Sequence, residues 1–453
     1  MANFSPKTLG EAPVGKLLFS MSMHTTLSLV LNSFYTLADT YFVAKSIGAY
    51  AAGGIALATP MLMLLTALST TVGTGASVVI SRALGSNNAE GAARAAANTF
   101  LTFWSAAITF GVVGLMFLEP ILTLLGTDPQ LTPYTRDYLR ILLCGTVFST
   151  GFSSLIRAEG NARYALLIWI IPVSLNIITD ALFLMVFHWG VKGAAASTVL
   201  TWMLSFSMSI YYFFFSKRDA YAIRRRHFKP DLRLMGDVIA QGSPALLSQI
   251  SGSISSGIIN GIFLNTGGAA ALSAFSVVSR IQSFFIMPQS GVVQGMQPLV
   301  SYNDANEKGE RVRKLILLAL AFNVLWGVAA LGTGSLFYKY LPGLFINEEA
   351  VLSIARPAML YMLFCLPFTG VPIIATAVFQ AKRKPLHAIL LQIGGVFALR
   401  IPLLFLLPNL LPEQGIWLAQ PVAEAMICLV SILALRFSKA GASALFAKKA
   451  IGR

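Results

Sequence analysis

The chain has 453 residues, of which 56% are hydrophobic and only 11% are charged. A soluble domain usually carries about 25% charged residues, so this composition excludes an ordinary water-soluble protein. The formal net charge of +15 raises the possibility of nucleic-acid binding. However, the Lys and Arg residues gather in alternate connections between apolar segments, as the positive-inside rule requires. Membrane topology therefore accounts for the charge, and we expect no nucleic-acid partner.

Long apolar runs recur along the chain, and each is long enough for a helix to cross the hydrocarbon core, which takes about 20 residues. Interior prolines such as Pro60 and Pro172 are tolerated in membrane helices, where they mark kinks or breaks. We therefore predict an all-α polytopic membrane protein. Its twelve transmembrane helices are expected at residues 15–43, 50–79, 95–118, 134–156, 164–188, 191–216, 237–263, 269–299, 315–338, 356–380, 386–408 and 414–436.

The two halves of the sequence resemble each other when one is aligned with the other at a constant offset. This offset aligns Gly48 with Gly268 and Gly75 with Gly295, and it needs no gap over the first helices of each half. Two six-helix halves in parallel orientation are a known architecture of secondary transporters. We therefore predict two bundles related by a pseudo-two-fold axis along the membrane normal, with substrate binding between them and alternating access by rocking of one against the other.

The longest polar stretch marks the predicted boundary between the two bundles. We assign residues 1–216 to an N-terminal bundle that couples to an ion, 217–236 to a basic cytoplasmic linker, and 237–453 to a C-terminal bundle. The charge bias places both termini in the cytoplasm. With no cleavable signal at the N-terminus, we expect a multi-pass protein of the cell inner membrane. A monomer is sufficient for transport, so we expect a monomer, although the sequence does not determine the oligomeric state.

The motifs of enzymes and of ATP-driven pumps are missing from the sequence. No G-x-x-x-x-G-K-[ST] motif occurs, so direct coupling to ATP is not expected. Four scattered histidines and three cysteines show no metal or disulfide spacing. We therefore expect a protein that is not an enzyme and has no cofactor or resident metal beyond a coupling ion, with small organic compounds and membrane lipids as its partners.

Ionisable side chains within predicted spans are costly in a bilayer, and they mark function by default. Asp39 and Asp180 lie at similar depths, and Thr198 lies near that level on the next helix. Asn176 is four residues from Asp180 and shares its helix face, and Tyr138 can reach the same level. These five residues predict an ion-coupling pocket. Its carboxyl groups suit a proton, and the oxygens of Asp39, Asn176, Asp180 and Thr198 suit Na⁺ equally well.

The remaining intramembrane charges have structural and functional interpretations. Glu424 is expected to pair with Arg400 or Arg280, or else to face the cavity and attract cations. His24 is expected to bond a backbone carbonyl, although it could titrate near neutral pH. Methionine, aromatic and amide side chains suit a plastic substrate cavity. By position alone, the candidates for its lining are Asn32, Tyr35, Met61, Met63, Gln282, Phe284, Met287 and Gln289.

Several short motifs follow one another along the predicted spans. They are NSFYTLADT at 32–40, GTGAS at 73–77, SRALG at 81–85, NIITD at 176–180, QGMQP at 294–298 and YN at 302–303. In this order and at these spans they resemble the motifs of the multidrug and toxic compound extrusion (MATE) family, and the resemblance runs from about residue 14 to residue 436. Asp39 with the Asn176 and Asp180 pair resembles the DinF-like branch, which implies proton coupling.

The chain departs from the family pattern at two places. His24 stands where the family often has a proline that bends the first helix, although its repeat mate is Pro244. The carboxylates that another branch places in helices seven and ten are absent, which argues against a cation site in the C-terminal half.

Two functions remain open from the sequence. The first is an efflux antiporter that exports amphipathic, often cationic, organic compounds in exchange for H⁺ or Na⁺. The alternative is a flippase or exporter of a lipid-linked or biosynthetic intermediate. A flippase would need a strongly cationic cavity, and Arg280 and Arg400 are few for that purpose.

Overall fold

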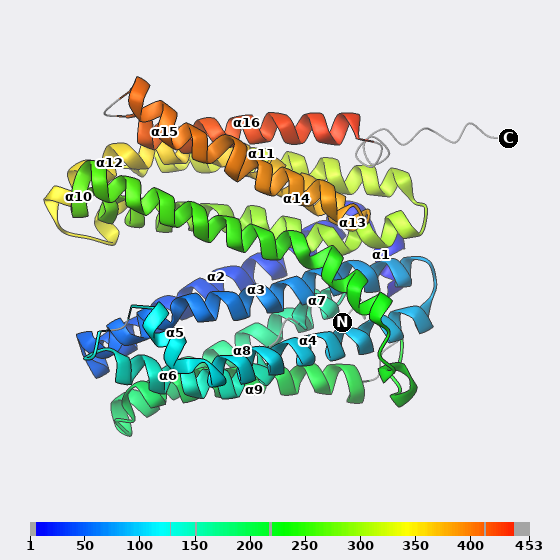
Figure 1. Ribbon diagram of the computed structural model, residues 1–453. Coiled ribbons are helices and arrows are strands. Elements are labelled where there is room, and N and C mark those ends of the chain that lie inside the picture. Colours follow the sequence, from blue (N-terminus) through cyan, green and yellow to red (C-terminus); the bar gives the residue numbers. More distant parts are fainter. Residues whose placement is uncertain (1–5, 127, 150–151, 217–219, 412–413, 439–453) are drawn as a thin grey trace. The chain divides into compact units, whose positions relative to one another are not determined.

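The computed structural model describes most of the chain as helix (Figure 1). Among the described residues, ten helices are long and apolar enough to cross a membrane. The pair α12 (Glu349–Leu363) and α13 (Leu366–Ala381) makes one further span that bends by 51°. The predicted all-α polytopic class is therefore confirmed. The described residues are 6–126, 128–149, 152–216, 220–411 and 414–438.

One helix is too long to be a single span. α10 (Leu232–Ala305) has 74 residues, about 110 Å at 1.5 Å per residue, against a hydrocarbon core of about 30 Å. Gly268 interrupts it with a φ of 65° and a ψ of −161°, in the region that favours glycine. The sequence predicts separate helices at 237–263 and 269–299, on either side of this residue. Counted as two spans, α10 brings the described part of the chain to the predicted twelve.

The chain forms two compact units. The first unit contains Leu27–Gly242, and the second contains Leu9–Thr26 with the residues from Ser243 onward. α2 (Val14–Ile47) and α10 therefore each contribute residues to both units. Our division of the chain into two bundles at a linker spanning 217–236 stays a prediction.

The first unit is a bundle whose helices approach closely at small residues. Gly111 of α4 packs so tightly on α6 that a Cβ there would lie 2.8 Å from the Leu143 carbonyl oxygen. Such close approach at glycines is typical of membrane helices. Besides its part of α2, the unit contains α3 (Ala49–Gly85), α4 (Ala89–Met116), α5 (Leu118–Leu124), α6 (Thr132–Gly145), η1 (Thr146–Phe148), α7 (Ser153–Ala158), α8 (Ala162–Asp180), η2 (Ala181–Val186), α9 (Gly190–Ile210), η3 (Tyr211–Phe215) and η4 (Arg225–Phe228).

The second unit contains a broken span that two glutamines hold in place. At the break between α12 and α13, the carbonyl oxygens of Met362 and Leu366 accept bonds from Gln282 (3.1 Å) and Gln289 (2.9 Å) of α10. An unpaired buried carbonyl would be costly in a bilayer, so these amides stabilise the bend. The other helices here are α11 (Gly309–Phe337), η5 (Pro342–Leu344), α14 (Pro385–Gly394), η6 (Gly395–Arg400), α15 (Ile401–Leu410) and α16 (Gly415–Phe437), and α1 (Pro6–Glu11) precedes them all.

The backbone supports the predicted internal repeat. Gly48 and Gly268, which the repeat aligns, both have positive φ values, of 90° and 65°. Asn87 and Glu307, aligned by the same offset, both have a φ of 56° at the end of a helix. α3 ends at Gly85 and α10 at Ala305, which are again aligned positions. The two halves of the chain therefore break their helices at equivalent positions.

Candidate functional site

A polar site inside the first unit is centred on Asp180. This residue ends α8, and the π-helical segment η2 begins at the next residue. π-helical turns are rare and often occur at functional sites. Asn176 lies one turn earlier, and both side chains are fully buried. The local backbone thus presents an amide and a carboxyl group together inside a membrane unit.

The hydrogen bonds around Asn176 tie α8 to α9. Its Nδ2 donates to the Ser197 hydroxyl at 2.9 Å, and that hydroxyl lies 2.6 Å from the hydroxyl of Thr179. The Oδ1 atom of Asn176 has no hydrogen-bond partner among the described residues, and neither does either oxygen of Asp180. Burying a carboxylate without a partner costs several kcal/mol of folding free energy. Asp180 therefore needs a proton or a cation in this arrangement.

Two further helices, α2 and α6, together with Thr198 of α9, supply the rest of the site. Asp39 of α2 lies close enough to Asp180 for the two carboxyl groups to interact directly. The phenol groups of Tyr35 on α2 and Tyr138 on α6 lie near both carboxyl groups, and each is within reach of the Thr198 hydroxyl on α9. Asp39 is half-buried, whereas Tyr138 is 4% exposed. The site therefore consists of two carboxyl groups ringed by neutral oxygen atoms.

The structure brings together all five residues predicted for ion coupling. It adds Tyr35, which the sequence assigns to the substrate cavity, and Ser197, which the sequence analysis missed. Ser197 precedes Thr198 and places a small hydroxyl opposite Asn176, so depth matching could have found it. The coupling role of these residues stays a prediction. Chemically, the site suits a shared proton, or a hard cation held by oxygen ligands.

Charged residues predicted for the other half lie in the second unit. Arg400 donates a hydrogen bond to Glu424, whereas Arg280 is exposed. Of the two arginines proposed as partners of Glu424, the structure thus pairs Arg400 with it. The His24 ring bonds the Ser20 carbonyl oxygen one turn earlier in α2, as expected for a histidine that satisfies its own helix.

The predicted cavity residues fall into two groups. In the first unit Met61 packs against the core, while Asn32 and Met63 are exposed. In the second unit the amides of Gln282 and Gln289 bond backbone carbonyls, as described above. Phe284 and Met287 are half-buried. A lining role for these residues stays a prediction.

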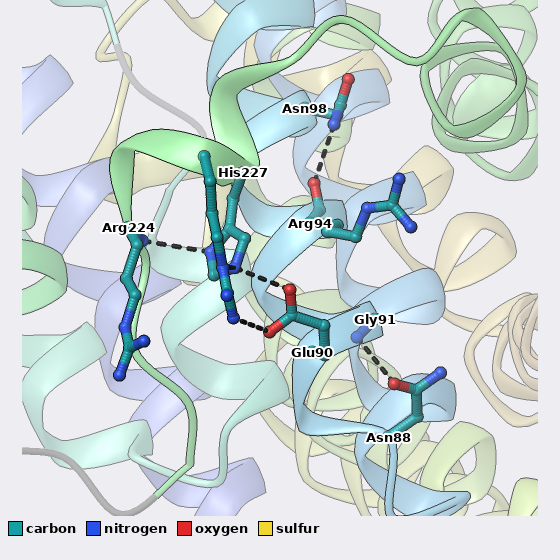
Figure 2. Close-up of polar contacts among 8 residues, drawn as sticks. Asn88, Glu90, Gly91, Arg94, Asn98, Arg224 and His227 are labelled. Carbon is teal, nitrogen blue, oxygen red and sulfur yellow. Dashed lines mark hydrogen bonds and ion pairs between the residues drawn. The ribbon is translucent and has the colours of Figure 1, made fainter.

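A separate polar cluster fastens the basic segment η4 to the start of α4 (Figure 2). The Arg224 backbone N–H donates to Nδ1 of His227 at 3.1 Å. Nε2 of the same ring lies 3.0 Å from a carboxylate oxygen of Glu90. Arg226 adds an ion pair to Glu90 at 2.9 Å. Further along, Asn98 accepts a bond from the Asp231 N–H at 2.8 Å.

This cluster predicts that Glu90→Gln will loosen the segment from Arg224 to His227. The amide keeps the size of the side chain but loses the ion pair with Arg226, so the segment should detach more often. Limited trypsin digestion after Arg224–Arg226 should be faster than in the unmodified protein. The matched control is Glu310→Gln, an exposed acid in the first turn of α11, which should leave the cleavage rate unchanged. Equal rates for both variants would contradict the fastening role.

Comparison with known proteins gives a consistent result over nearly the whole chain. The family described as MatE matches residues 25–182 and 244–406, one match in each half. The chain is 23% identical over 429 residues to the FAD transporter of Shewanella oneidensis, covering 92% of this chain and 93% of the relative. It is also 23% identical over 427 residues to the multidrug export protein MepA of Staphylococcus aureus strain MRSA252, covering 93% and 94%.

Solved structures show the same fold. A transporter of the MOP superfamily from Pyrococcus furiosus aligns with a TM-score of 0.91 at 22% identity, covering 98% of this chain and 99% of that one. The outward-facing conformation of a multidrug resistance MATE family transporter aligns with a TM-score of 0.90 at 23% identity, covering 96% and 97%. The family match and the curated relatives, together with the helical fold, define a polytopic membrane transporter, not an enzyme. The chain belongs to the MatE family, the multidrug and toxic compound extrusion transporters.

Proposed function

We propose that this protein is a secondary active efflux antiporter of the inner membrane that exports amphipathic, often cationic, organic compounds in exchange for H⁺ or Na⁺. The observation that carries the proposal is the buried Asp180 carboxyl group, which has no hydrogen-bond partner among the described residues and lies beside Asp39. Two adjacent carboxylates cannot both stay charged in a dry site without a bound cation. Uptake and release of the ion therefore changes the charge of the site.

This change of charge supplies a physical basis for coupling. A neutral site and a charged site favour different packings of the surrounding helices, because an uncompensated charge is costly in the membrane. η2 begins directly after Asp180 and lies where a small change in helical register is easiest. We propose that ion occupancy biases alternating access in this way. The relative named MepA is a multidrug export protein, which supports organic compounds as the exported substrates.

An alternative substrate class has a specific observation in its favour. A relative of equal similarity is an FAD transporter, which is consistent with export of a biosynthetic intermediate. The charge bias of the connections supports cytoplasmic termini under either substrate class. Both alternatives use the same ion-coupling site, so they differ in cargo and agree in mechanism.

The test is transport into everted membrane vesicles that contain the protein. A fluorescent organic cation is added outside, and uptake is measured with a pH gradient alone and then with a sodium gradient alone. We expect uptake under at least one of these gradients, and the effective gradient identifies the coupling ion. Absence of uptake under both gradients would remove the drug-export proposal and leave the biosynthetic alternative.

A further inference from the structure

The interior of the second unit holds an ion pair that the coupling site does not use. Arg400 Nη2 donates to Oε1 of Glu424. The Glu424 side chain is 9% exposed and that of Arg400 is 22% exposed. Arg400 closes η6, a π-helical segment, and Glu424 lies in the middle of α16. A buried charge within a membrane span is costly, and it marks a functional site by default.

Arg400 adjoins a π-helical segment, as the central acid of the first unit does. Asp180 precedes η2, and Arg400 ends η6. π-helical turns are rare and often occur at functional sites. The first unit thus has a buried acid at such a turn, and the second unit has a partly buried base.

The guanidinium group of Arg400 has unused binding capacity. It carries five N–H donors in a planar fork. Among the described residues, Glu424 is the acceptor of the one side-chain hydrogen bond that Arg400 donates. Its Nε atom is buried and has no partner in the described part of the chain. A planar fork with free donors matches the paired oxygens of a carboxylate or phosphate group.

Neutral polar groups occur near the pair, on α16 itself and on neighbouring helices. Gln420 of α16 reaches the Gln282 side chain of α10 at 3.4 Å. Cys365, at the break between α12 and α13, is buried and lies within electrostatic range of both Arg400 and Glu424. These groups can contact a polar ligand without adding charge. Arg400 and Glu424 are therefore the charged members of the cluster.

Charge balance decides which ion can enter this cluster. Arginine cannot lose its proton in a protein, whereas a buried glutamate becomes neutral by taking one up. A cation on Glu424 would leave Arg400 charged and unpaired. An anion on Arg400 leaves Glu424 free to accept one proton, and no uncompensated charge remains. Exchange at Arg400 is therefore the favourable direction.

We propose that Arg400 binds the carboxylate or phosphate group of an organic anion, and that Glu424 occupies this position until the anion arrives. One anion and one proton enter together: the Arg400–Glu424 ion pair opens, the anion pairs with Arg400, and Glu424 becomes a neutral acid. This proposal deepens the proposed function, on which it rests, because it adds organic anions to the exported compounds. The binding step itself is measurable without transport.

Titration calorimetry on the purified full-length protein tests the binding step. The probes are benzoate and phenyl phosphate, with benzyltrimethylammonium as a cation of similar size. Each titration is run in two buffers of different ionisation enthalpy, which counts the protons exchanged. We expect the anions to bind with uptake of about one proton each, and the cation to bind no better in this protein than in Arg400→Gln. Binding of the anions without proton uptake, or no binding at all, would overturn the proposal.

Two variants separate this role from a purely structural ion pair. Glu424→Gln leaves Arg400 charged and without its partner, a state that costs several kcal/mol, so anions should bind at least about tenfold more tightly and without proton uptake. A structural ion pair predicts only lower stability there, and unchanged or weaker anion binding in this variant would refute the proposal. Arg400→Gln should abolish binding, and size-exclusion profiles show whether it is folded.

A third variant keeps this proposal distinguishable from the proposed function. Asp39→Asn changes the site in the first unit, so it should stop transport yet bind benzoate with the affinity of the unmodified protein. If the unmodified protein shows no vesicle transport but binds the anions, the ion-coupled export proposal fails and the Arg400 site stands. If the unmodified protein transports normally but binds no anion, the Arg400 site fails and the ion-coupled export proposal stands.

Discussion

Asp39→Asn and Asp180→Asn are each expected to reduce gradient-driven uptake into everted vesicles to the level of vesicles without the protein. The asparagine side chain has nearly the shape of aspartate, but it can neither take up a proton nor carry the charge that holds a cation. Because Asp39 and Asp180 interact directly, loss of either should uncouple the site. Neither change introduces a charge into the membrane, so insertion should be normal.

The control for these variants is Asp137→Asn on α6. Asp137 precedes Tyr138 of the site in the chain, but its own side chain is 43% exposed and pairs with Lys192 at 3.4 Å. An exposed ion pair contributes little, so uptake should persist. Full activity of Asp39→Asn and Asp180→Asn, at the expression level of Asp137→Asn, would eliminate the proposed coupling site.

The membrane spans could be predicted closely because a bilayer imposes a simple rule on sequence. A helix must stay apolar for the thickness of the core, and the predicted helix at 191–216 matches Gly190–Phe215. The residues of the coupling site could also be predicted, because acidic residues within spans are rare and the rise per residue of a helix fixes their depth in the membrane. Asp39 and Asp180 were placed together on that basis, and the structure brings their carboxyl groups into contact range.

Features that depend on packing between helices could not be read in the same way. Gln282 and Gln289 were assigned to the substrate cavity, because an amide in an apolar span looks functional. Their bonds to the carbonyls of Met362 and Leu366 follow from a break in a helix much further along the chain. Pro367, at the start of α13, is a local signal of the break, but the side chains that bond the carbonyls there are set by packing between helices. The π-helical turns have no comparable signal in the sequence.

The choice of Arg400 over Arg280 as the partner of Glu424 has the same origin. All three residues sit in apolar surroundings in the sequence, and either pairing satisfies charge balance. The face of each helix that turns inward decides between them: Arg280 is exposed on α10, and Arg400 is half-buried. Helix rotation depends on the whole bundle, so pairing of intramembrane charges needs the structure, whereas their presence does not.

Glycine contacts within each unit follow the internal repeat and show where the helices tolerate no side chain. In the first unit, a Cβ on Gly75 of α3 would lie 2.9 Å from the Gly242 nitrogen of α10. In the second, a Cβ on Gly295 of α10 would lie 2.9 Å from the Ser22 nitrogen of α2. The repeat aligns Gly75 with Gly295 and Ser22 with Gly242, so it preserves a contact as well as a sequence motif.

Gly242→Ala is therefore expected to destabilise the first unit severely. The added Cβ would lie 1.9 Å from the Thr71 carbonyl oxygen, and because that atom is backbone, α3 and α10 must separate along their length. Overpacking a core usually costs about 1–3 kcal/mol, and a clash with rigid backbone should reach or exceed the upper end. Gly252→Ala, on the same helix with open space around it, is the matched control. Melting temperatures of the two variants in detergent should differ strongly, with Gly242→Ala lower. Equal melting temperatures for Gly242→Ala and Gly252→Ala would mean that α3 and α10 can move apart without loss of stability. The close contact at Gly242 would then not be important for the fold.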